Sequence, residues 1–143
     1  MAQFGSKLIN EDIDYRLSRI HEPFIVYDIK ALRDAGLHDH IEIPAGFVHD
    51  YESVPIIKGT SKRGGVVHDY LCRMDSIPVV TKKLAADVYF EIMEASSAEK
   101  ELGVFSRLNL WFRKWIKWGV VIIAPGHFHK HKVMATYEEM SGM

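Results

Sequence analysis

The spacing of apolar residues changes half-way along this chain, and this change constrains the fold more than any other feature. In the first fifty residues apolar and polar side chains partly alternate, and β-branched and aromatic residues are frequent. That pattern predicts strands. In the second half apolar residues recur at intervals of three and four, which predicts helices with one buried face. We therefore expect an α+β fold, with a small antiparallel N-terminal sheet packed against about three C-terminal helices.

Three strands are expected in the first half. Residues 13–20 and 24–29 form two of them, with a turn at His-Glu-Pro, residues 21–23. The third covers residues 41–48 and contains Pro44 and Gly46, which suit an edge position or a bulge. The stretch Gly-Thr-Ser-Lys-Arg-Gly-Gly at 59–65 predicts a flexible surface loop.

Two helices are expected after that loop. The first places four residues at i, i+3, i+4 and i+7 on one buried face, namely Val67, Tyr70, Leu71 and Met74. The second is expected over residues 82–96, with Thr81 as its N-cap. Its acidic flank consists of Asp87, Glu91 and Glu94.

A third helix is expected to open near Ser106. One side of it is aromatic and aliphatic, with Leu108, Trp111, Phe112, Trp115 and Ile116, and the other carries Arg107, Arg113, Lys114 and Lys117. Such a stripe is typical of a core-facing helix. The alternatives are a helix on a membrane surface and a platform that stacks on nucleic-acid bases.

Composition limits the class of protein. The length of 143 residues fits a single domain, residues 1–143. With 18 basic and 19 acidic residues there is no strong nucleic-acid signal, and no apolar run is long enough to predict a transmembrane segment. The single cysteine, Cys72, excludes an internal disulfide and favours a reducing intracellular compartment.

A short repeat carries the residues best suited to chemistry. Residues 46–51, Gly-Phe-Val-His-Asp-Tyr, return as residues 65–70, Gly-Val-Val-His-Asp-Tyr. A carboxylate beside an imidazole can orient it, set its tautomer or share a metal with it, and a nearby phenol adds a hydrogen-bond donor. The repeat therefore predicts a polar site that contains His49 and His68.

The same region resembles the DUF1353 family, a group of small uncharacterised proteins common in tailed phages and prophages. The resemblance is carried by Ile43-Pro44-Ala45-Gly46-Phe47, Asp50, Ser53-Val54-Pro55, Val67-His68-Asp69-Tyr70-Leu71, Ala86-Asp87 and Phe90. The resemblance implies a phage or prophage setting and brings no established reaction. In that setting we expect a protein of the host cytoplasm or the virion, with other virion proteins as partners. The resemblance marks as matching polar positions Asp50, Ser53, His68, Asp69 and Asp87. At His49 the family tends to have a small hydroxyl residue, and at Glu52 a small apolar one.

Three kinds of site remain open for these residues. In a catalytic site, Asp50 or Asp87 would orient His68 as a general base, and Ser53 would be a nucleophile or a ligand. Asp69 cannot easily orient His68, because adjacent side chains on a helix diverge by about 100 degrees. In a structural site, Asp69 would pair with Arg73 one helical turn on, Asp50 would cap a turn, and His68 would be a satisfied core histidine.

The third kind is a metal site. His68, Asp50, Asp87 and His49 would gather around a divalent ion, and this mixture of nitrogen and oxygen ligands suits zinc, manganese or iron. No known metal-binding spacing supports it in the sequence. The resulting functional hypotheses are a small hydrolase or metal-dependent enzyme with a His/Asp centre, and a non-catalytic virion or assembly protein with a buried His/Asp network. An enzyme requires an open pocket at these side chains, whereas a structural network can be sealed.

Overall fold

The computed structural model describes residues 2–13, 17–49, 62–99, 132–136 and 138–139. The elements in chain order are β1 (Gln3–Phe4), β2 (Asn10–Asp12), β3 (Ser18–Ile20), β4 (Phe24–Tyr27), α1 (Lys30–Asp34), β5 (Ile41–Ile43), β6 (Val48–His49), α2 (Lys62–Leu71) and α3 (Lys82–Glu99). The strands lie in the first half of the chain and the two longest helices in the second, so the predicted α+β class is confirmed.

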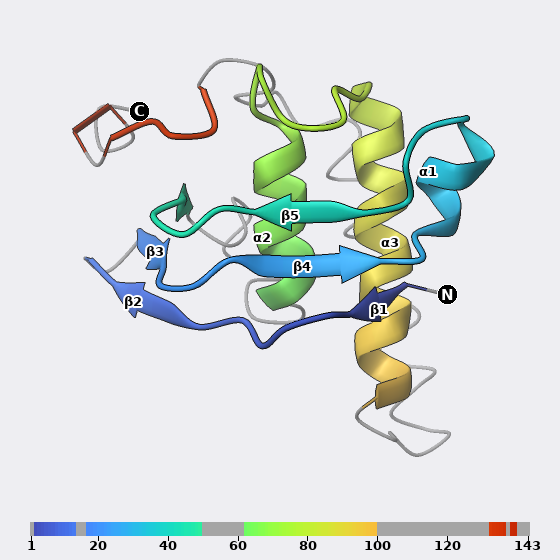
Figure 1. Ribbon diagram of the computed structural model, residues 1–143, viewed down its shortest axis with the longest axis horizontal. Helices are drawn as coiled ribbons and strands as arrows, with labels where there is room; N and C mark the ends of the chain where they lie inside the picture. Colours follow the sequence, from blue (N-terminus) through green and yellow to red (C-terminus); the bar gives the residue numbers. More distant parts are fainter. Residues whose placement is uncertain (1, 14–16, 50–61, 100–131, 137, 140–143) are drawn as a thin grey trace.

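The strands form two small antiparallel sheets. One has the order β1-β4-β5 and the other β2-β3-β6. Figure 1 shows β1, β4 and β5 running across α2 and α3, which stand side by side on one face of this sheet. The core fills the space between them and is almost entirely aliphatic and aromatic. Its members include Phe24, Val26, Ile41, Ile43, Val66, Val67, Leu71, Val88 and Ile92.

Two predicted strands are wrong in their limits. Of the strand expected at 13–20, residues 18–20 form β3, which pairs antiparallel with β2, whereas residues 14–16 lie outside the described part of the chain. The strand expected at 41–48 is divided into β5 and β6, which belong to different sheets. The chain changes sheet at Gly46, whose φ of +90° is a left-handed conformation that favours glycine. Because the hydrophobic pattern continues across this turn, the sequence pattern did not predict the break between the two strands.

The prediction of a flexible loop at 59–65 is wrong for residues 62–65, because α2 already begins at Lys62. Gly64 and Gly65 are buried in that helix. Their low helix propensity is overridden by the packing of α2 against the rest of the core. Residues 59–61 lie outside the described part of the chain.

The second predicted helix is confirmed as α3, and so is its cap. The backbone N–H of Leu84 donates to Thr81 Oγ1 at 3.1 Å. The short helix α1 has no counterpart among the predictions. The predicted third helix, with Trp111 and Trp115, lies outside the described residues. Among the helices that are described, none is both long and apolar enough to cross a membrane.

Candidate functional site

Asp69 and Arg73 form an ion pair across one turn at the end of α2. Arg73 Nη2 lies 3.3 Å from Asp69 Oδ2, and the arginine side chain is only 3% exposed. This is the pairing that the structural interpretation of the motif predicted. Because Asp69 is paired with Arg73, one oxygen of its carboxylate is turned toward the arginine.

Arg73 also binds main-chain carbonyl groups of two other segments. Its Nη2 donates to Val48 O at 2.7 Å, on β6, and its Nη1 donates to Lys132 O at 3.3 Å. Its guanidinium carbon lies 4.7 Å from the centre of the Phe47 ring, a cation–π contact. A single buried guanidinium therefore connects the end of α2, the second sheet and residue Lys132.

His49 lies in the same region and is completely buried. Its Nε2 is 2.8 Å from Asn10 Oδ1, and since a carbonyl oxygen only accepts, Nε2 carries the proton. Burial, and then the positive charge of Arg73, lower the pKa of His49 to about 3, while Asp12 opposes them. The imidazole is therefore neutral at physiological pH.

A row of polar residues crosses the second sheet beside His49. Asp12 pairs with Ser18 and Ser18 with His49, so the three side chains project from the same face. The row contains the residue types of a hydrolytic triad, but it is bonded differently. The hydroxyl of Ser18 donates to Asp12 Oδ1 at 2.7 Å, whereas in a triad it would bond to the imidazole. Ser18 is also buried, which suits a structural role.

His68 lies on the other side of α2, toward α3. Its ring meets the ring of Tyr89 edge-on, with centroids 5.6 Å apart, and Cys72 Sγ lies 3.6 Å from its Nδ1. Burial, followed by the charge of Lys82, lowers the pKa of His68 to about 4. Like His49, it is a neutral imidazole, and it is partly buried between α2 and α3. His68 and Asp69 thus serve different interfaces of α2.

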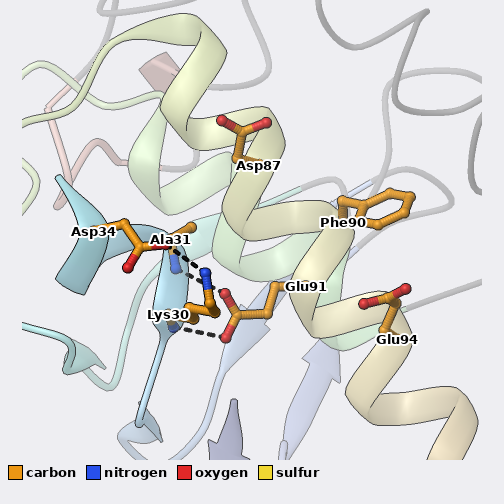
Figure 2. Close-up of a pocket in the computed structure, with 7 residues that line it drawn as sticks. All are labelled: Lys30, Ala31, Asp34, Asp87, Phe90, Glu91 and Glu94. Carbon is orange, nitrogen blue, oxygen red and sulfur yellow. Dashed lines mark hydrogen bonds and ion pairs between the residues drawn. The ribbon is translucent and has the colours of Figure 1, made fainter. Parts of the chain in front are cut away.

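Asp87 lies in an open groove between α1 and α3 (Figure 2). The groove has a volume of about 520 Å³, and it is lined by Lys30, Ala31, Asp34, Asp87, Phe90, Glu91 and Glu94. Asp87 Oδ2 is 3.4 Å from Lys83 Nζ. The groove is rich in carboxylates, and neither histidine of the motif is among its lining residues.

Glu91, which lines this groove, binds the first turn of α1. Its two carboxylate oxygens accept the backbone N–H groups of Lys30 at 2.8 Å and Ala31 at 2.9 Å, as Figure 2 shows. These are N–H groups of the first turn of α1, which receives no cap from its own N-cap residue, Ile29. A carboxylate of α3 therefore caps α1 and fixes it against the longer helix.

The predicted site residues are thus distributed over several places. His49 and Asp69 both lie beside Arg73, His68 faces α3, and Asp87 faces the groove. Asp50 and Ser53 lie outside the described residues, so the dyad that includes Asp50 stays a prediction. Within the part of the chain that the structure describes, no three His, Cys, Asp or Glu side chains gather as metal ligands. The metal site expected from His68, Asp50, Asp87 and His49 includes Asp50, and it therefore also stays a prediction.

The functional role of several residues was missed from the sequence. Asn10 binds His49, Asp12 and Ser18 complete the polar row, and Glu91 caps α1. The alternation of Asn10, Glu11 and Asp12 does place Asn10 and Asp12 on one face of a strand, which was an available signal. Nothing in the sequence indicated that Glu91 would reach across to another helix.

One comparison with known proteins gives a match. A family model described as "Protein of unknown function (DUF1353)" matches residues 25–107, more than half of the chain, so the chain belongs to this family. The matched range includes His49, His68, Asp69, Arg73 and Asp87, but it excludes the partners on β2 and β3. No curated protein and no solved structure shows significant similarity to the chain.

Proposed function

We propose that this member of the DUF1353 family is a non-catalytic virion or assembly protein of a tailed phage or prophage, in which the His/Asp motif builds the fold. The observation that carries the proposal is the use of Arg73. It is nearly inaccessible, it pairs with Asp69, and it donates to carbonyl groups of two further segments. The Asp69 carboxylate therefore holds the guanidinium that joins the end of α2 to β6, which is a structural role.

The neutral state of both motif histidines also supports a structural role. Burial is the largest cause of the lowered pKa of His49 and of His68. Each ring packs against an aromatic neighbour, since Phe47 stacks on His49 at 5.9 Å and Tyr89 meets His68 edge-on. A buried polar network of this kind can fix one arrangement of the elements without taking part in a reaction.

Complementation of a phage or prophage from which the gene has been deleted tests this proposal. Asp87→Asn and His68→Gln remove the proposed acid–base groups while keeping similar shapes. We expect both variants to restore the yield of infectious particles, provided that their melting temperatures stay close to the wild-type value. We also expect mass spectrometry to find the chain in purified particles or in assembly intermediates.

A folded Asp87→Asn protein that restores no particles would contradict the assembly role, because it would show that the carboxylate has a chemical task. Asp34→Asn is the matched control, since Asp34 lines the same groove and lies outside the polar motif. This control separates a general effect of charge in the groove from a specific requirement for Asp87.

The second candidate is a small hydrolase or metal-dependent enzyme with His68, Asp50 and Asp87 at its centre. The open groove at Asp87 favours it, because an enzyme needs an accessible pocket at its functional side chains. Metal analysis of protein purified without a histidine tag is the direct test. Equimolar zinc, manganese or iron that is lost in His68→Gln would support this candidate over the assembly role.

A further inference from the structure

We draw no further inference here: the strongest candidate, the exposed apolar patch of Ile77 and Val79 on the connection between α2 and α3, carries none, because nothing in the structure shows what covers it.

Discussion

Two charged side chains in this protein, Arg73 and Glu91, each bind the main chain of another element, but Arg73 is buried and Glu91 lies at an open groove. Arg73, two residues after the end of α2, binds carbonyl groups of β6 and of the segment at Lys132, and it is buried. Glu91 of α3 binds N–H groups of α1 at the edge of an open groove. Each joins a helix to the main chain of another element. The difference lies in access to water, because water can replace the partners of Glu91 but not those of Arg73.

The largest effect is therefore expected at Arg73. Arg73→Met keeps much of the apolar volume but leaves Asp69 without its cation and two carbonyl groups without their donor. Removing one partner of a buried ion pair typically costs about 3–5 kcal/mol. We expect a loss of this size in the free energy of unfolding, measured in urea.

Arg33→Met is the matched control for that substitution. Arg33 also pairs with carboxylates, those of Asp28 and Asp39, but its side chain is half exposed. The urea midpoint of this variant should stay close to the wild-type midpoint, because exposed pairs add little. Equal losses in the two variants would remove the distinction between the buried junction and the surface.

The second prediction concerns acid. His49 and His68 have pKa values of about 3 and about 4 in the folded protein, below the value of about 6.5 expected in the unfolded chain. The unfolded chain therefore binds more protons between these limits. The free energy of unfolding should therefore have its full value above about pH 6.5. It should fall as the pH drops toward 4, by about 1 kcal/mol or more per pH unit.

Chemical denaturation at a series of pH values measures this slope. His49→Gln should reduce the slope, because one of the two imidazoles with a lowered pKa is gone. His38→Gln is the control, since His38 is exposed, and it should keep the wild-type slope. A stability that is flat between pH 6.5 and 4 would show that the histidines are not held neutral by the fold.

A smaller effect is expected in the groove. Glu91→Gln keeps one acceptor oxygen but loses the charge that binds the N–H groups of Lys30 and Ala31. A lost helix cap costs about 1 kcal/mol. Glu42→Gln on β5 is the control, because Glu42 is exposed on a strand outside the groove. A loss at Glu91 as large as the loss at Arg73 would mean that α1 is as essential as the buried junction.

The sequence predicted those parts of the fold that depend on local pattern. The 3.6-residue period and Thr81 predicted α3 and its cap, and β-branched runs predicted β4. The division of residues 41–48 between two sheets was not predictable in this way. It depends on a turn at Gly46 whose apolar neighbours, Ile43 and Phe47, are buried on both sides of the break.

The candidate site was predictable only where its partners are close in sequence. The spacing of four residues between Asp69 and Arg73 predicted their ion pair, as it would on any helix. The pairing of His49 with Asn10 spans 39 positions, and that of Glu91 with Lys30 spans 61. Such contacts are decided by the packing of whole elements, so no local spacing indicates them.

The central claim is that Asp69 serves the fold through Arg73, and a double-mutant cycle tests it most directly. The cycle compares Asp69→Asn, Arg73→Met and the double variant by urea unfolding at neutral pH. For a buried contact of this kind we predict a coupling energy of about 1–3 kcal/mol, with the double variant less destabilised than the sum of the single variants. A coupling energy near zero, together with a fully stable Asp69→Asn protein that fails to restore phage particles, would contradict the claim.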